Sequence, residues 1–313
     1  MLSVGPLFEK YGVYIFLALL FILSSFLSPA FLTAQNLKNV FTPAAALGMV
    51  SLGQTFVILT GRGGLDLSVA SVMATVTVIA SMNTRGQDAL LFPVSIVCIL
   101  FGVLVGLGNG LLITKRRVQP FIATLGMMII VQGLRFLYSK GAPKGSFPPF
   151  LRYLGTGTIG PIPVSVLSFA LLLAIAAIVL RKTVFGRQVY TVGGNLEAAI
   201  ICGYNTDIII ISIYIISGFT AALAGLFLAG WIGVSDNWVG QGYEVDSIAA
   251  VVMGGTSFAG GKGGVLGTTA GVMIIATLYN LVLLLHLPLQ LQYVVKGAAI
   301  ILAASFYARK ARH

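Results

Sequence analysis

Hydrophobic runs recur along the chain, and most of them are bounded by Gly, Pro, Asn or charged residues. An α-helix needs about 20 mostly apolar residues to cross the hydrocarbon core of a bilayer. The pattern predicts membrane-spanning helices near residues 11–28, 43–60, 66–82, 89–113, 120–139, 162–180, 208–230, 245–260, 264–286 and 289–308. We therefore expect an all-α polytopic membrane protein with about ten spans, in a single transmembrane domain that covers residues 1–313.

The composition supports this expectation. Hydrophobic residues make up 58% of the 313 positions and charged residues only 9%, whereas soluble globular proteins are about 25% charged. These values exclude an ordinary soluble enzyme and also a disordered chain, which would be poor in apolar residues. The two cysteines, Cys98 and Cys202, lie in or beside apolar runs, so we expect neither a disulfide framework nor a Cys-based metal site.

The basic residues predict the orientation of the spans. With an N-terminus inside the cell, ten spans place three basic clusters on the cytoplasmic side, as the positive-inside rule requires. The clusters are Lys115, Arg116 and Arg117, then Arg181, Lys182 and Arg187, and finally Arg309, Lys310 and Arg312. Both termini and the loop 182–207 are therefore expected in the cytoplasm. The excess of Lys and Arg in the cytoplasmic loops accounts for the net charge of +11, so we expect no nucleic-acid partner.

Several landmarks occur twice, five predicted spans apart. They are Gly102, Gly106 and Gly110 against Gly263, Gly267 and Gly271, Asp66 and Met73 against Asp246 and Met253, and Pro120 against Pro288. Because five is odd, the second copy would enter the membrane from the opposite side, as in the inverted repeats of transport proteins. We predict a 5+5 inverted-topology repeat with halves at 11–140 and 162–308. The glycines alone would also fit simple close packing of helices.

Ionisable residues are scarce inside the predicted spans. Carboxylates such as Asp66 fall at span ends, which argues against an ion-coupled carrier with mid-membrane acidic groups. Lys296 is the exception, and Asp246 or Glu244 could pair with it as a structural or gating contact. Arg135, near the outer end of its span, is expected to reach outward to the membrane surface.

Catalytic motifs are absent from the sequence. It contains neither H-E-x-x-H nor G-x-S-x-G, and its only histidines are His286 and His313. The glycine-rich run 254–263 lacks the first Gly of a phosphate-binding loop, and Gly263 stands where that loop needs Ser or Thr. We therefore expect no catalytic residue, no metal site and no cofactor bound by this chain.

The cytoplasmic loop 182–207 carries its own helix signal. Asn195 can cap a helix over 196–202, Glu197 suits its first turn, and Gly203 can end it. The helix would expose the apolar side chains Leu196, Ala199 and Ile200. Two partners could cover them: the lipid headgroups, or a cytoplasmic protein, which we favour.

Four runs in this order resemble the membrane-spanning permease subunits of the ribose, xylose and galactose type of ABC importer. They are residues 63–69 (GGLDLSV), 185–195 (FGRQVYTVGGN), 242–257 (GYEVDSIAAVVMGGTS) and 259–263 (AGGKG). The resemblance covers nearly the whole chain. It implies a permease without ATPase activity of its own in the bacterial cytoplasmic (inner) membrane.

The resemblance also implies partners and site residues. Such a permease works as a homo- or heterodimer with two cytoplasmic ATPase subunits, which bind ATP and Mg, and with an extracytoplasmic substrate-binding protein. The coupling helix that docks the ATPase would comprise Gly193, Gly194, Asn195, Leu196, Glu197, Ala198, Ala199 and Ile200.

Asn109, Trp231 and Asn280 would be substrate-pathway candidates, although Asn in a span also serves as an interhelical contact. The expected cargo is a monosaccharide. A nucleoside or another small polar solute is the alternative within this machinery, and an ion-coupled secondary carrier or channel is the alternative outside it.

Overall fold

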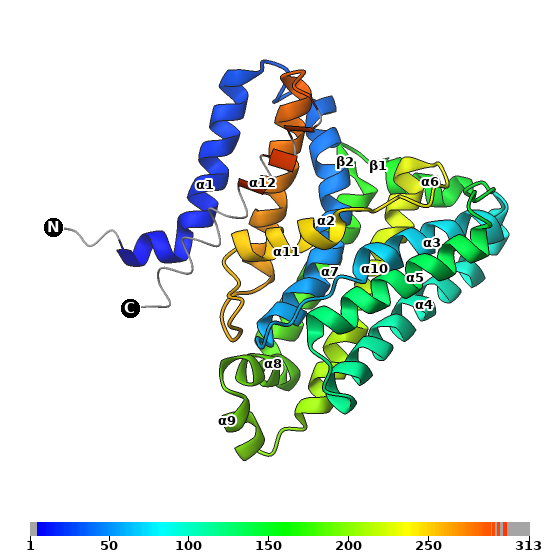
Figure 1. Ribbon diagram of the computed structural model, residues 1–313. Helices are drawn as coiled ribbons and strands as arrows, with labels where there is room; N and C mark the ends of the chain where they lie inside the picture. Colours follow the sequence, from blue (N-terminus) through cyan, green and yellow to red (C-terminus); the bar gives the residue numbers. More distant parts are fainter. Residues whose placement is uncertain (1–4, 289, 292, 295–296, 299–313) are drawn as a thin grey trace.

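The computed structural model describes residues 5–288, 290–291, 293–294 and 297–298, and in this part the chain is almost entirely helical (Figure 1). The helices are α1 (Gly5–Leu27), α2 (Ala34–Leu59), α3 (Val69–Thr84), α4 (Asp88–Lys115), α5 (Pro120–Ser139), α6 (Pro149–Thr156), α7 (Val164–Lys182), α8 (Val184–Gly194), α9 (Leu196–Ile201), α10 (Thr206–Ile232), α11 (Tyr243–Met253) and α12 (Val265–Leu284). The strands β1 (Thr158–Ile159) and β2 (Ile162–Pro163) form a short antiparallel hairpin in which Ile159 pairs with Ile162.

Helices α2 and α10 form the centre of the bundle. Helix α10 packs against α4, α2, α3 and α6, while α2 packs against α10, α12, α11 and α7. In Figure 1, α1 and α12 lie to one side, α3, α4 and α5 to the other, and the short α11 crosses the middle of the view. The core between these helices buries large side chains such as Met49, Met73 and Leu228.

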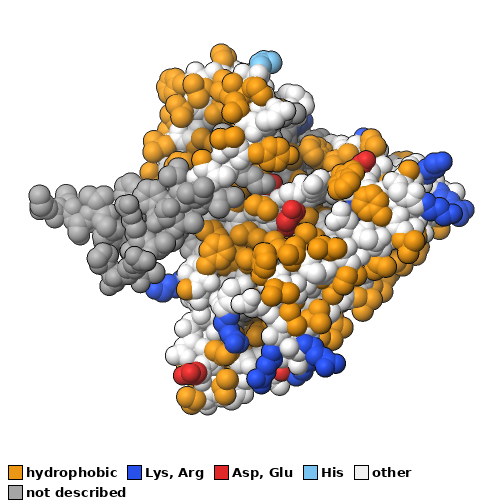
Figure 2. Space-filling model, viewed as in Figure 1, with side chains coloured by type: hydrophobic (Ala, Val, Ile, Leu, Met, Phe, Trp, Pro, Cys, Tyr) orange, Lys and Arg blue, Asp and Glu red, His pale blue; other side chains and the backbone are white. Residues whose placement is uncertain are grey.

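The described part of the chain contains six helices long and apolar enough to cross a membrane, namely α2, α4, α5, α7, α10 and α12. Residues 11–27 of α1 and helix α3 are shorter apolar helices. Apolar side chains such as Leu104, Leu137 and Leu171 are more than half exposed, and apolar groups cover much of the face in Figure 2. Because water would disfavour such a surface, it fits contact with lipid.

Glycines on α4 allow it to approach α10 closely. A Cβ atom at Gly102 would collide with the carbonyl oxygen of Gly218, and one at Gly106 with the carbonyl oxygen of Tyr214. In lipid, such close backbone approach is a main source of helix association. The two helices are therefore held together along a shared line of small residues.

The matching glycines in the second half contact a different neighbour. Gly267 and Gly271 of α12 face Gly254, directly after α11, and Ala250 of α11, whereas Gly102 and Gly106 of α4 face α10. Gly263 precedes α12 and lies in a loop with φ +123°. The glycine steps thus permit close packing in both halves without making equivalent contacts.

The predicted span 43–60 begins too late. Helix α2 starts at Ala34, where the Thr33 hydroxyl accepts a hydrogen bond from the Asn36 amide at 3.3 Å. Pro43 lies inside the helix and does not mark its beginning, since neighbouring helices can support a proline within a membrane helix.

The predicted span 245–260 is also wrong in length, because α11 ends at Met253, before Gly254 and Gly255. Its 11 residues extend about 16 Å, about half of a hydrocarbon core. Helix α3 likewise starts at Val69, three residues after Asp66, whereas the predicted span began at residue 66. Both acidic landmarks therefore lie at or before the start of a short helix.

The other predicted spans agree with α1, α4, α5, α7, α10 and α12 to within a few residues, apart from the N-terminal extension of α1 to Gly5. Helix α6, the hairpin and helix α8 were not expected from the hydrophobic pattern. Most of the predicted span 289–308, including Lys296, lies outside the described residues.

Candidate functional site

Helices α8 and α9 form a short projection at the lower end of the molecule in Figure 1. Helix α8 begins after Thr183, whose hydroxyl accepts a hydrogen bond from Gly186 N at 3.1 Å. Asn195 separates the helices and caps α9, because its Oδ1 accepts a hydrogen bond from Ala198 N at 3.0 Å. Gly203 follows α9 with φ +77°. The helix, its cap and its terminating glycine are thus confirmed.

One side of α9 faces the protein itself. Ala199 is fully buried and belongs to an apolar cluster with Ile209 and Ile213 of α10, so the expectation that Ala199 is exposed was wrong. Leu196 is half-buried and packs against the same cluster. The side chains that α9 presents outward are Glu197, Ile200, which is 57% exposed, and Ile201, which is 85% exposed.

The end of α8 meets two glycine-containing loops, which we call the glycine junction: Gly61, Gly193, Gly260 and Gly261. A Cβ atom at Gly193 would collide with the carbonyl oxygen of Leu59 at the end of α2, and would lie 2.7 Å from Gly261 N. Gly261 N donates a hydrogen bond to the same carbonyl at 2.9 Å. At Gly194, by contrast, a Cβ atom would meet nothing within 4 Å.

A tyrosine ties α8 to the same loop. The Tyr190 hydroxyl donates a hydrogen bond to the Gly263 carbonyl at 2.9 Å. Burial raises the pKa of Tyr190, against an opposing effect of Arg181, so the hydroxyl keeps its proton at neutral pH. The glycine junction and Tyr190 therefore connect the helix before α9 to α2 and to the loop between α11 and α12.

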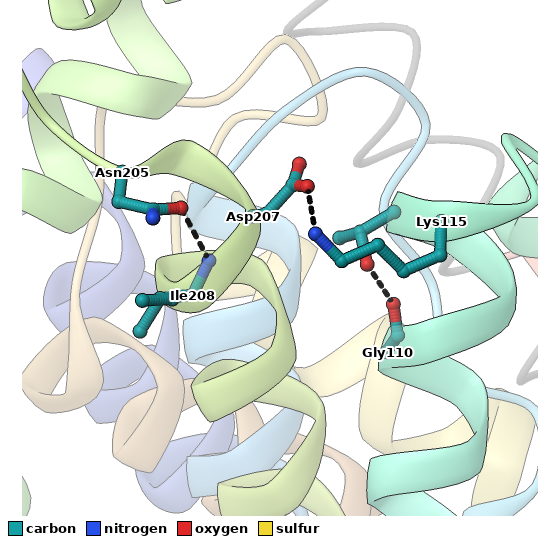
Figure 3. Close-up of polar contacts among 6 residues, drawn as sticks. Gly110, Lys115, Asn205, Asp207 and Ile208 are labelled. Atoms are coloured by element: carbon teal, nitrogen blue, oxygen red, sulfur yellow. Dashed lines mark hydrogen bonds and ion pairs between the residues drawn. The ribbon is translucent and has the colours of Figure 1, made fainter.

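Charged residues gather at this end of the molecule. Lys115 at the end of α4 and Asp207 at the start of α10 form an ion pair with Nζ and Oδ2 2.7 Å apart, while Asn205 caps α10 through Ile208 N (Figure 3). Lys and Arg side chains also cluster around the lower end in Figure 2. The side chains of Lys115 and Asp207 are 60% and 40% exposed, so the pair contributes at most about 1 kcal/mol.

Asp66 lies just before the start of α3, at a span end as predicted. It is fully buried, and its carboxylate accepts hydrogen bonds from Ser68 Oγ at 2.6 Å and Ser217 Oγ at 2.7 Å. Asn109 Nδ2 lies 3.4 Å from Asp66 Oδ1 and donates to Ser68 Oγ at 2.9 Å. These contacts join α4, α10 and the loop before α3, and in this arrangement Asn109 connects helices.

Asn280 also joins two helices. It exchanges hydrogen bonds of 3.0 and 2.8 Å with Asn36, which links α12 to the first turn of α2. Asp246 is buried near the start of α11 and accepts a hydrogen bond from the Tyr279 hydroxyl at 2.8 Å. Lys296 lies outside the described residues, so its pairing with Asp246 or Glu244 stays a prediction.

Trp231 is 38% exposed near the end of α10. Glu244 lines a cavity of about 110 Å³ between α3, α5, α11 and the loop 233–242. Arg135 reaches this cavity and is only 4% exposed, so the expectation that it extends to the membrane surface was wrong. Its sequence signal was a cation inside an otherwise apolar span, which is costly and favours the protein interior over lipid.

The thiols differ in accessibility. Cys98 of α4 is buried, while Cys202, directly after α9, is exposed. Within the described residues, no group of three or more His, Cys, Asp or Glu side chains could hold a metal ion.

Comparisons with known proteins identify the family. Residues 36–304 match a family described as branched-chain amino acid transport system / permease component. The ribose import permease of Bacillus subtilis is 40% identical over 303 residues, which are 94% of this chain and 91% of that protein.

Two further relatives are named for other sugars. The galactose/methyl galactoside import permease of Escherichia coli is 35% identical and covers 96% of this chain and 95% of its own. The L-arabinose ABC transporter permease of Azospirillum brasilense is 32% identical, covering 97% of this chain and 89% of its own. No solved structure matches the chain. The extent of these similarities shows that the chain belongs to this family of ABC-transporter permeases.

Proposed function

We propose that this protein is the membrane-spanning permease of an ATP-driven, binding-protein-dependent importer for a monosaccharide in the bacterial cytoplasmic membrane. The observation that carries the proposal is similarity over nearly the full length to permeases named for ribose, galactose and L-arabinose. The chain itself would supply no covalent chemistry. ATP and Mg would be bound by separate ATPase subunits, and an extracytoplasmic binding protein would deliver the sugar.

Helix α9 is the proposed ATPase contact. Glu197, Ile200 and Ile201 face outward, so this small surface remains free of the protein's own core. Ala199 and Gly193 lie on the side facing the protein. Ala199 anchors α9 to α10, and Gly193 allows α8 to pack against the end of α2. A displacement of α9 by the ATPase would therefore be transmitted through the glycine junction to α2 and to the loop before α12.

The proposed topology has ten spans, cytoplasmic termini and an inverted repeat. Its support is a set of paired contacts: α10 packs against α4 and α3, as α2 packs against α12 and α11. Helix α3 also contacts α4, and α11 likewise contacts α12. In these contacts α2, α3 and α4 correspond to α10, α11 and α12. The two sets are five spans apart when α7 is counted as the sixth span, which is the relation that an inverted repeat would produce.

Transport would follow from two arrangements of a pair of these permeases, open to opposite sides of the membrane. The ATPases can shift the balance only if they bind the two arrangements with different affinity. Asp66 with Ser217, and Asn36 with Asn280, fix opposite parts of the bundle in the arrangement described above. These polar contacts are candidates for breaking and reforming as the helices move.

Uptake by the reconstituted importer tests the function. The permease would be placed in proteoliposomes with its partner ATPase and binding protein, and offered D-ribose, D-galactose, L-arabinose, adenosine and L-leucine. We expect accumulation of one of the sugars that depends on ATP and on the binding protein. Uptake by the permease alone, driven by an ion gradient, would instead establish a secondary carrier. Uptake of only adenosine or L-leucine would still support an ATP-driven importer but would refute a monosaccharide as its substrate.

A second experiment tests the docking role of α9. Combining Glu197→Lys with Ile201→Asp alters two exposed side chains, and we expect the ATPase to be lost on co-purification while membrane insertion stays normal. Lys144→Glu, in the loop after α5, reverses one charge at a position distant from α9 in the sequence and should retain the ATPase. Retention of the ATPase by the double variant would count against docking at α9.

A further inference from the structure

The cavity of about 110 Å³ beside α11 is built from elements distant in the sequence. Ser71 comes from the first turn of α3, Gln132 and Arg135 from α5, Trp238 and Gln241 from the loop 233–242, and Glu244 from α11. None of the substrate-pathway candidates expected from the sequence lines it. The cavity is only partly enclosed, so a solute can reach it.

The backbone around the cavity is irregular where a membrane helix would be regular. The loop 233–242 precedes α11, which has 11 residues and so extends only about 16 Å. Gly240 and Gly242 in this loop have φ +84° and +94°. Non-helical backbone at membrane depth is tolerated only where protein covers it or where it lines a water-containing cavity. Interrupted helices of this kind form the substrate sites of many transporters.

Arg135 supplies hydrogen-bond donors to this cavity. It is 4% exposed, yet its one hydrogen bond among the described residues runs from Nη1 to the Ser71 carbonyl at 3.4 Å. Its Nε has no hydrogen-bond partner there, and Asp236 interacts with the guanidinium only electrostatically. A guanidinium carries five N–H donors. Because Nε is itself inaccessible, the donors left for a solute are those on Nη1 and Nη2 that the Ser71 carbonyl does not use.

The remaining lining groups suit a polyhydroxylated ring. Each sugar hydroxyl both donates and accepts, and Gln132, Gln241 and Glu244 offer amide and carboxylate partners in both senses. Trp238 adds an aromatic surface that can cover the apolar C–H groups of a sugar. Its ring is held by Phe136, with centroids 5.5 Å apart in an edge-on arrangement.

We infer that this cavity is the membrane-embedded site at which the transported monosaccharide pauses, with Arg135 and Gln132 binding its hydroxyls and Trp238 contacting its ring. The inference rests on the proposed function. A volume of about 110 Å³ is small beside enclosed ligand pockets of about 300 Å³ or more, so the cavity holds only part of the sugar. Incomplete enclosure keeps binding weak, which a transport pathway needs for release.

Uptake by the complete importer tests the site, with D-ribose, D-galactose and L-arabinose as probes. Gln132→Leu and Gln241→Leu each remove hydrogen bonds to the sugar, and we expect uptake to fall about tenfold while ATPase co-purification stays normal. Gln35→Leu is the matched control, because Gln35 is exposed at the start of α2 and makes one long bond of 3.3 Å to Asn39. Wild-type uptake by both cavity variants would overturn the inference.

Tryptophan fluorescence gives an independent readout, because Trp231 and Trp238 are the only two tryptophans. In the purified permease, Trp231→Phe leaves Trp238 as the sole tryptophan, and we expect millimolar sugar to change its emission in a saturable way. Trp238→Phe leaves Trp231 and should give no such change. A response of Trp231 alone would overturn the inference. If the wild-type importer shows no ATP-dependent uptake of any sugar, the proposed function itself fails.

Discussion

A methyl group at Gly193 should disturb the contact between α8 and the end of α2. In the substitution Gly193→Ala, the new Cβ atom would collide with the Leu59 carbonyl oxygen and lie 2.7 Å from Gly261 N. The 2.9 Å hydrogen bond from Gly261 to Leu59 cannot persist unless α8 moves away. The matched control is Gly194→Ala, the next residue of the same helix, where the added atom meets nothing within 4 Å.

The expected magnitude follows from the difference between these two variants. Both replace Gly by Ala in α8 and gain a similar helix propensity of about 0.5–1 kcal/mol, so this gain cancels in the comparison. Overpacking a close contact costs about 1–3 kcal/mol, and loss of one backbone hydrogen bond costs about 1 kcal/mol. Gly193→Ala should therefore be less stable than Gly194→Ala by about 2–4 kcal/mol.

Denaturant unfolding of the purified permease in detergent measures this difference. In the reconstituted importer, Gly193→Ala should also hydrolyse ATP with little sugar uptake, because the outward-facing residues Glu197 and Ile201 are untouched while the link to α2 is broken. Equal unfolding midpoints for Gly193→Ala and Gly194→Ala would refute the packing argument. Normal uptake by Gly193→Ala would refute the role of the glycine junction in coupling.

Three other substitutions test separate contacts. Ser217→Ala removes a donor to the buried Asp66 carboxylate and should lower the free energy of unfolding by about 1.5–3 kcal/mol; an unchanged denaturant midpoint would contradict this. Asn280→Leu should cost about 1 kcal/mol through its two bonds to Asn36, and adding Asn36→Leu should restore part of that loss. Asn195→Ala should destabilise α9 by about 1 kcal/mol and reduce ATPase co-purification, whereas Asn195→Asp, which can still cap, should retain it.

Many helix boundaries were predictable because helix-breaking residues such as Pro and Gly stand at the ends of the apolar runs. Helix α5 begins at Pro120 and α12 directly after Gly264, as the sequence indicates. Helix α9 was predictable for the same reason, since Asn195 and Gly203 are local signals. Hydropathy could not show that α11 ends halfway, because the residues after Met253 remain largely apolar or small while the glycines turn the chain.

The contacts within the candidate site were less predictable because they depend on residues far apart in sequence. Ser217 is 151 positions from Asp66, and Asn280 is 244 positions from Asn36. The sequence marked several of these residues as polar groups in apolar surroundings, but gave no way to pair them. Arg135 was misplaced because an arginine near a span end can reach either lipid headgroups or an internal cavity, and only the packing of α5 decides.

Because the two thiols differ in exposure, thiol labelling of the wild-type chain can test the membrane topology. Cys98 is buried and Cys202 lies exposed beside α9, so a charged maleimide that cannot cross lipid would modify one position without any engineering. Inverted vesicles should be labelled at Cys202 and intact cells should not. Labelling the permease with and without the bound ATPase should also show whether the ATPase covers Cys202, because a bound partner would shield the thiol from the reagent.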